Sequence, residues 1–172
     1  MARIPLVDPD TATGALAETF GEIKSHAGKV GNIWRALGNN PRLLKAVWDR
    51  RQAVMEGDAL PMATKEAIAL AVSEANACTY CVTNHSAALS RLGESTERIE
   101  QIRQHKGRDQ ADQALLDFCV KSSTDPHSIS DGEFEELRSL GYSDEAIFEA
   151  VGVATHYTAV NRFLDTFLVD LD

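Results

Sequence analysis

Residues that interrupt helices are scarce in this sequence. Only 5 of its 172 residues are proline and 11 are glycine, and few of the glycines fall inside apolar stretches. Proline breaks the interior of a helix and glycine weakens it, so their scarcity favours helical structure. No stretch shows the sustained apolar–polar alternation of a half-buried strand. The sequence therefore predicts an all-α protein.

A basic surface pattern is also missing. The formal net charge is −9, and the nearest approach to a basic run is the short pair Arg50–Arg51. Proteins that bind nucleic acids draw most of their affinity from neutralising phosphates with Lys and Arg. We therefore expect no nucleic-acid partner.

Long apolar runs are absent as well. The longest ones fall far short of the ~20 residues needed to cross a bilayer, and the first ten residues lack the apolar centre of a signal peptide. These features predict a cytoplasmic protein with no membrane partner. Thiols are kept reduced in that compartment, so a close cysteine pair there is more typical of catalysis or metal binding than of a structural disulfide.

The chain does contain enough apolar material for one core. Hydrophobic residues make up 44% and charged residues 25% of the sequence, which is typical of a single soluble domain over residues 1–172. Apolar residues recur at helical spacing, Pro41 and Pro61 stand where helices are expected to open, and Ser130 with Glu133 forms a capping box. We expect helices over about 11–28, 41–57, 61–75, 78–92, 95–107, 109–123, 130–141 and 143–170.

Two of these helices share a short pattern. EAIALAVSEA (66–75) and EAIFEAVGVA (145–154) match in six positions at an offset of 79 residues. The match suggests an internally duplicated two-helix unit, although buried helices also draw on the same few residue types. At that offset Tyr157 stands in place of Cys78 and Leu164 in place of His85, so only the first copy would carry chemistry.

The segment NACTYCVTNH holds the most reactive residues of the chain. Cys78 and Cys81 are three positions apart and His85 follows four positions later, so all three share one face of a helix. Residues at that spacing have Cβ atoms ~5–6 Å apart, and the two thiols can close a disulfide that is easily reduced again. An imidazole one turn beyond Cys81 can take the proton of its thiol.

Two neighbours add to this group. Asn76 is a poor residue for a helix interior, so we expect a break there and a new helix that starts near Cys78. The unpaired N–H groups of a helix start stabilise a thiolate. Glu66 lies in the otherwise apolar stretch KEAIALAV, where a carboxylate is costly to bury without a partner. If the two helices fold back as a hairpin, Glu66 can approach the face that carries the cysteines and the histidine.

The full pattern resembles a known family. Glu66, then Cys78-x-x-Cys81-x-x-x-His85 with ALAVSEANACTYC between, is similar to the alkylhydroperoxidase AhpD-like branch of the carboxymuconolactone decarboxylase family. It looks closest to the set known as peroxidase-related proteins. A C-x-x-C alone is weak evidence, whereas this combination in an all-helical chain is quite specific.

The resemblance continues outside the motif. It runs through NPRLLKAVW, EAIFEAV and VNRF and covers roughly residues 30–168, which leaves residues 1–28 as an N-terminal extension and first helix. It implies the AhpD-like helical fold and, since the family commonly forms trimers or hexamers of small subunits, a homo-oligomer.

The resemblance also implies an activity, the thiol-dependent reduction of a peroxide. Cys81 matches the attacking cysteine, Cys78 the one that closes the disulfide, and His85 with Glu66 the proton relay. The enzyme would need no metal or other cofactor, only an external dithiol, either a thiol/disulfide reductant protein or a small molecule. The well-studied branch has a histidine between the cysteines, whereas this chain has Tyr80, a far weaker base near neutral pH.

The order of the two cysteines has arguments on both sides. In a helical C-x-x-C the first cysteine usually gains more from the helix start, which favours Cys78 as the nucleophile. The histidine one turn beyond Cys81 favours Cys81. We follow the histidine.

Other interpretations of the same residues remain open. The pair could be a non-catalytic redox sensor on a scaffold protein, a pair of buried core residues, or part of a Cys/His/Glu metal site. The decarboxylase branch of the family is disfavoured because its chemistry does not call for a cysteine pair. Cys119 lies on an apolar stripe and is expected in the core, and His156 and Tyr157 could line the active-site cleft or a subunit interface.

Overall fold

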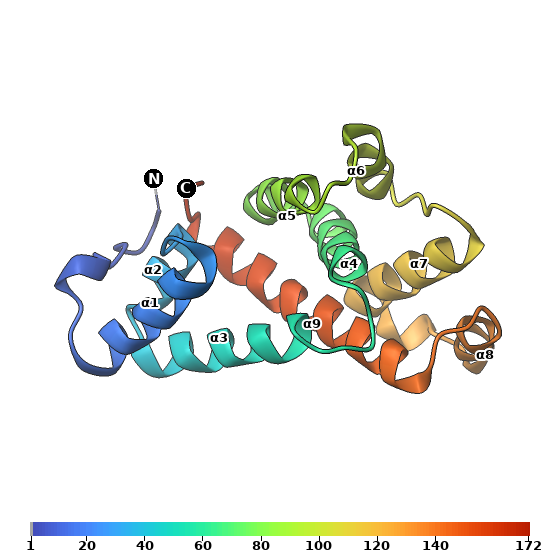
Figure 1. Ribbon diagram of the computed structural model, residues 1–172, viewed down its shortest axis with the longest axis horizontal. Helices are drawn as coiled ribbons and strands as arrows, with labels where there is room; N and C mark the ends of the chain where they lie inside the picture. Colours follow the sequence, from blue (N-terminus) through green and yellow to red (C-terminus); the bar gives the residue numbers. More distant parts are fainter. Residues whose placement is uncertain (1) are drawn as a thin grey trace. The chain divides into compact units, whose positions relative to one another are not determined.

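The computed structural model describes residues 2–172, and over that range it contains helices and no strand (Figure 1). The all-α prediction is confirmed. Two short 3-10 helices, Pro9–Thr11 and Pro126–Ser128, accompany the α-helices. The latter are α1 (Gly14–Ala27), α2 (Asn32–Leu37), α3 (Pro41–Met55), α4 (Met62–Ala75), α5 (Thr79–Arg91), α6 (Thr96–Arg103), α7 (Gln110–Thr124), α8 (Asp131–Ser139) and α9 (Asp144–Phe167).

Helix ends follow the local signals in the sequence. The expected capping box of α8 is present, with the Ser130 side chain accepting from the backbone of Glu133 and the Glu133 side chain accepting from the backbone of Ser130. Ser95 caps α6 by accepting from the backbone N–H of Arg98. Each bond satisfies a backbone donor that the helix itself leaves unpaired.

The chain divides into two compact units. One comprises residues up to 53 together with 163–172, and the other comprises residues 54–162. The expectation of a single domain over residues 1–172 stays a prediction. All residues of the predicted site lie in the second unit.

The first unit is built around an aromatic cluster. Trp48 of α3 meets Trp34 edge to face with ring centroids 5.2 Å apart, and His26 of α1 at 5.5 Å. The backbone N–H of Arg3 donates to the carbonyl of Phe167 at 2.7 Å, which ties the N-terminal segment to the end of α9.

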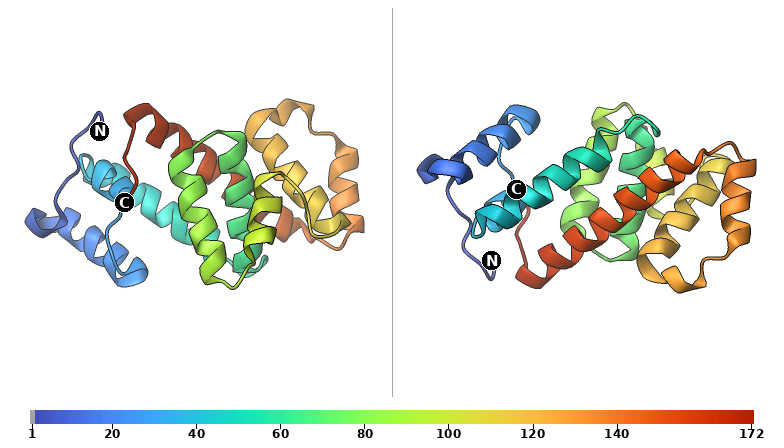
Figure 2. Two further views of the ribbon diagram at one scale, coloured as in Figure 1. Left: turned by 90° about the horizontal axis from the view of Figure 1, so that it is seen from above. Right: turned by 90° about the horizontal axis from the view of Figure 1, so that it is seen from below.

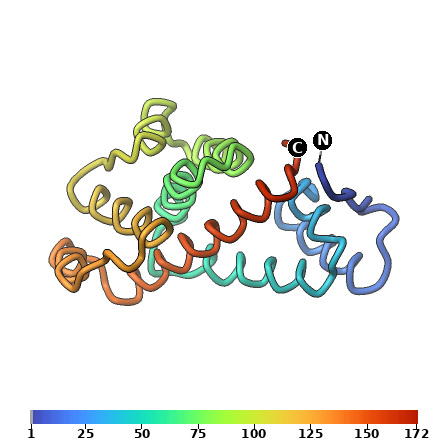
Figure 3. The backbone as a smooth tube through the Cα atoms, turned by 180° about the vertical axis from the view of Figure 1, so that it is seen from behind, coloured from blue at the N-terminus to red at the C-terminus, as the bar shows by residue number. Residues whose placement is uncertain are grey.

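In the second unit, α4 is the central helix. It contacts α5, α6 and α7, and every residue from 65 to 73 is buried, as its nearly continuous apolar sequence predicts. Figure 2 shows α4 and α5 folded back on each other as a hairpin. The view from behind in Figure 3 shows α8 (orange) packed beside α7 (yellow).

A buried ion pair secures the entry to α4. The Lys65 ammonium is fully buried and lies 2.9 Å from Glu149 Oε1 of α9; it also donates to the carbonyls of Met55 and Gly57. The other oxygen of Glu149 accepts from the backbone of Leu60 at 2.7 Å. A charge this deep is tolerated because its donors are satisfied. The pair therefore fixes the loop between α3 and α4 against α9.

The two copies of the suspected repeat differ in their continuity. The first copy lies in α4, which ends at Ala75 directly before a break in the helix. The second lies in α9, which continues unbroken through the corresponding positions 155–157. Duplication itself stays a prediction, and the break that exposes a new helix start belongs to the first copy alone.

No helix within residues 2–172 combines the length and the apolar character needed to span a membrane.

Candidate functional site

The turn between α4 and α5 creates the site. Asn76 caps α4, and Ala77 then adopts a left-handed conformation with φ of 58°. The N–H of Ala77 donates to the carbonyl of Glu74, and that of Cys78 to the carbonyl of Ser73, at 2.9 and 3.0 Å. These two bonds close the helix end and turn the chain into α5. The break predicted near Asn76 is confirmed.

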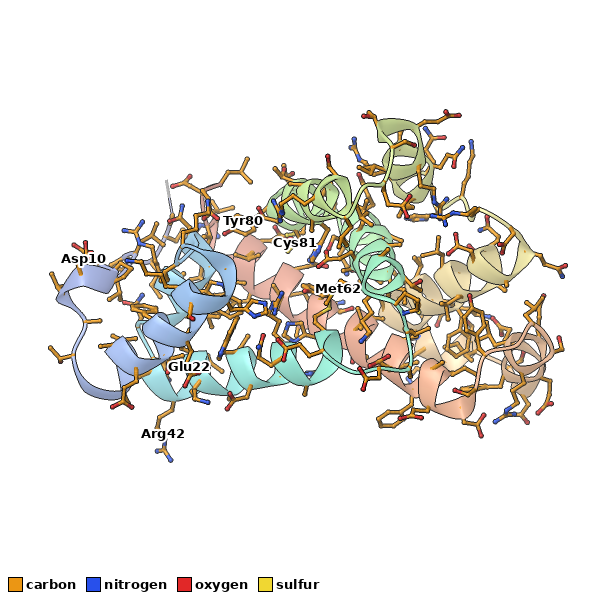
Figure 4. All side chains as sticks on the ribbon, viewed as in Figure 1. Asp10, Glu22, Arg42, Met62, Tyr80 and Cys81 are labelled. Carbon is orange, nitrogen blue, oxygen red and sulfur yellow. The ribbon has the colours of Figure 1, made fainter. Side chains whose placement is uncertain are left out.

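Both cysteines lie at the start of α5. Cys78 is the N-cap residue and Cys81 is the third residue of the helix, labelled beside Tyr80 in Figure 4. Here the N–H groups of the first turn point out of the helix end with the positive pole of its dipole. Both residues are thiols, and they are 0% and 3% exposed. A helix start of this kind favours the thiolate form.

His85 and Glu66 are hydrogen-bonded partners. Nδ1 of His85 lies 2.7 Å from Oε2 of Glu66, and both side chains are more than nine-tenths buried. The α4–α5 hairpin brings them together across 19 positions of sequence, as the expected hairpin requires. An ionised carboxylate can only accept, so Nδ1 carries the proton of this bond and Nε2 of the neutral ring is left with a lone pair.

Tyr157 of α9 packs against the histidine. Its ring meets that of His85 edge to face with centroids 4.3 Å apart, and His156 lies 4.9 Å from Tyr157 on the other side. All three rings are buried. Of the two places expected for His156 and Tyr157, the structure puts Tyr157 beside the site. Its ring and the Glu66 carboxylate together restrict the orientation of the His85 imidazole.

A polar network lies behind the turn. The Asn76 amide donates to Asn161 Oδ1 at 3.0 Å and to Ser123 Oγ at 3.1 Å, and the Asn161 amide donates to Ser73 Oγ at 3.1 Å. Ser73 and Asn161 are fully buried. The sequence did not predict this network, because its members come from α4, α7 and α9. The only local signal was the Asn76 expected to break the helix.

The third cysteine is separate in character. Cys119 of α7 is fully buried, and burial raises the pKa of its thiol because the charged form loses its hydration. The core location predicted for Cys119 is confirmed. Within residues 2–172 no three His, Cys, Asp or Glu side chains form a group that could hold a metal ion.

The family resemblance expected from the sequence is confirmed. Residues 41–118, which include Glu66, both cysteines and His85, match the model of the carboxymuconolactone decarboxylase family. An alkyl hydroperoxide reductase of Mycobacterium tuberculosis (strain ATCC 25618 / H37Rv) is 30% identical over 93 residues. That match covers 54% of this chain and 27% of the relative.

Solved structures share the fold over nearly the whole chain. An alkylhydroperoxidase AhpD core, the peroxidase-related protein from Ralstonia eutropha JMP134, superposes with a TM-score of 0.91 at 25% identity, over 99% of this chain and 92% of that one. The debrominase Bmp8, in complex with 2,3,4-tribromopyrrole, superposes with a TM-score of 0.83 at 23% identity, over 100% of this chain and 92% of its own. The chain thus has the AhpD-like helical fold, and proteins with this fold perform more than one reaction.

Proposed function

We propose that this protein reduces hydroperoxides with the Cys78/Cys81 thiol pair. The observation that carries the proposal is the buried Glu66–His85 hydrogen bond, 2.7 Å long, on the helix that begins with the two cysteines. A buried carboxylate that orients an imidazole one turn from a thiol is the arrangement of an activated nucleophile. The relative from M. tuberculosis, named an alkyl hydroperoxide reductase, supports the same activity.

Cys81 starts the proposed reaction. Nε2 of His85 takes the thiol proton, and Glu66 stabilises the resulting imidazolium through Nδ1. The thiolate attacks one oxygen of the hydroperoxide, so an S–O bond forms and the O–O bond breaks. The leaving alkoxide or hydroxide takes a proton from His85 and departs as an alcohol or water. Cys81 is then a sulfenic acid, oxidised by two electrons, and the peroxide is reduced by two.

Cys78 completes the oxidative half. Its thiol attacks the sulfenic sulfur of Cys81, an S–S bond forms, and the hydroxyl group leaves as water. An external dithiol then exchanges with this disulfide, returns both cysteines to thiols and leaves as a disulfide itself. Neither cysteine is more than 3% exposed, so exchange requires an opening of the α4–α5 turn or a reductant small enough to enter.

The test compares two cysteine variants in a peroxide-consumption assay with dithiothreitol as the reductant. Cys81→Ser removes the nucleophile, and we expect it to consume peroxide no faster than buffer. Cys119→Ala is the matched control, because it removes a buried thiol remote from the motif, and it should retain the wild-type rate per folded molecule. If Cys81→Ser retains the rate, the proposal is wrong.

A non-catalytic redox sensor is the main alternative. A sensor would also form the disulfide, but it would not recycle quickly with a reductant. Multiple turnovers of peroxide per protein molecule in excess dithiothreitol distinguish the enzyme from the sensor. One equivalent of peroxide consumed and no more would favour the sensor.

The assembly and compartment are proposed on the resemblance and the composition. We expect a cytoplasmic homo-oligomer, a trimer or hexamer, which needs no metal or other cofactor. Sedimentation equilibrium measures the assembly, and a monomer at micromolar concentration would contradict this part of the proposal.

A further inference from the structure

The two cysteines are held in different ways. Cys81 lies inside α5, where the helix itself fixes its position. Cys78 lies at the end of the turn, and the residue before it, Ala77, has a left-handed φ of 58° that a residue with a side chain rarely adopts. The position of Cys78 relative to Cys81 therefore depends on whatever holds this turn in place.

Asn161 of α9 bridges the turn from behind. Its amide nitrogen donates to Ser73 Oγ at 3.1 Å, and its amide oxygen accepts from Asn76 at 3.0 Å. Ser73 also accepts the backbone N–H of Cys78 at its carbonyl oxygen, at 3.0 Å. Asn161 thus contacts one residue just before the turn and one residue within it, and Ser73 is a single hydrogen bond away from Cys78.

The surroundings of Asn161 make these bonds strong constraints. The residue is 0% exposed, as is Ser73, so no solvent replaces a bond that is lost. On its other side, Asn76 donates to Ser123 Oγ of α7, which is hydrogen-bonded to Thr158 at 2.7 Å. The turn is therefore anchored to a second helix as well, and Asn161 provides the direct link to α9.

We propose that Asn161 is a positioning residue for disulfide closure: it holds the 76–78 turn so that Cys78 is preset to attack Cys81. The catalytic use of this closure rests on the proposed function, whereas the effect on the thiol pair does not. Without Asn161 the left-handed turn relaxes and the effective concentration of the Cys78 thiol at Cys81 falls. The first oxidation of Cys81 is unaffected, because His85 and Glu66 do not contact Asn161.

The test measures the two steps separately. We compare Asn161→Ala with Thr158→Val, which removes a hydroxyl one turn earlier on α9 and leaves both bonds of Asn161 intact. In Asn161→Ala, single-turnover oxidation by hydrogen peroxide should proceed within about twofold of wild type. Disulfide formation should slow at least fivefold, and trapping with dimedone should reveal an accumulated sulfenic acid on Cys81.

A second readout requires no peroxide. In glutathione redox buffers, the equilibrium constant for closing the Cys78–Cys81 disulfide should fall at least fivefold in Asn161→Ala and remain within twofold of wild type in Thr158→Val. Ser73→Ala removes only a hydroxyl and should shift the constant in the same direction, so it serves as the test if Asn161→Ala does not fold.

Several results would overturn the proposal. An unchanged disulfide equilibrium in Asn161→Ala, equal shifts in both α9 variants, or no Cys78–Cys81 disulfide in any buffer would each do so. Failure of the proposed function gives another pattern, because wild type would then close the disulfide in glutathione buffer and yet not consume peroxide.

Discussion

Glu66 Oε2 lies 2.7 Å from Nδ1 of His85, and neither side chain is more than 9% exposed. A carboxylate buried in this way is stable only with a partner, and here the partner is an imidazole one turn from a thiol. The hydrogen bond fixes the ring orientation and supports a positive charge on it. The first prediction concerns this pair.

Replacing Glu66 by Gln should slow peroxide reduction by about 100-fold, in the range typical of a positioned proton-transfer group. The amide retains the size of the side chain but not its negative charge, so the imidazolium loses its stabilising partner. Stopped-flow measurement of Cys81 oxidation checks this. Glu74→Gln is the control, because Glu74 is on the same helix and pairs at the surface with Arg103. Equal rates for wild type and Glu66→Gln would show that the relay has no role.

The sequence was sufficient for the parts of the site that are local. The break at Asn76, the helix start at the cysteines and the shared face with His85 all follow from short-range rules. The hairpin that brings Glu66 to His85 was a conditional expectation, and the structure satisfies it.

Contacts between distant helices could not be predicted in this way. The Lys65–Glu149 pair and the Asn76–Asn161 bond join residues 84 and 85 positions apart. Each depends on how α4 packs beside α9, which no spacing within either helix determines. Tyr157 was singled out only as an interruption of an apolar helix, and its contact with His85 comes from the same packing.

The second prediction concerns the buried ion pair. Lys65→Met should lower the free energy of unfolding by about 3–5 kcal/mol, because it leaves the carboxylate of Glu149 largely buried without its cation. Urea unfolding followed by circular dichroism measures the change. The double variant Lys65→Met/Glu149→Leu should recover part of the loss. If the double variant is less stable than the sum of both single losses, the pair is not the source of the effect.

The third prediction concerns the left-handed residue of the turn. Ala77 is exposed and has a φ of 58°, so backbone strain dominates the effect of substitution there. Ala77→Gly should raise the free energy of unfolding by roughly 0.5 kcal/mol, because relief of strain exceeds the added entropy of the unfolded chain. Ala77→Val should lower it by about 1–2 kcal/mol. Thermal unfolding of the three proteins gives the order, and the reverse order would contradict the turn geometry.

The fourth prediction is a pH dependence at α8. Hydrogen bonds from Lys121 and Ser130 hold the pKa of Glu133 at about 2, below its ordinary value of 4.5. A depressed pKa stabilises the folded state above the unfolded pKa, and this contribution is lost as the pH falls from 4.5 toward 2. The stability difference between wild type and Glu133→Gln should therefore be constant above pH ~5 and shrink below pH 4.5. Urea unfolding at pH 7, 5 and 3.5 checks this, and a difference that grows on acidification would contradict it.

The account depends most on the thiol pair itself. The most direct measurement counts the thiols of the reduced protein before and after one equivalent of hydrogen peroxide, and maps the product by peptide mass spectrometry. We predict the loss of two thiols, a disulfide between Cys78 and Cys81, an intact thiol at Cys119, and full recovery with dithiothreitol. Three thiols that survive the peroxide, or a product in which Cys119 is oxidised and the pair is not, would contradict the account.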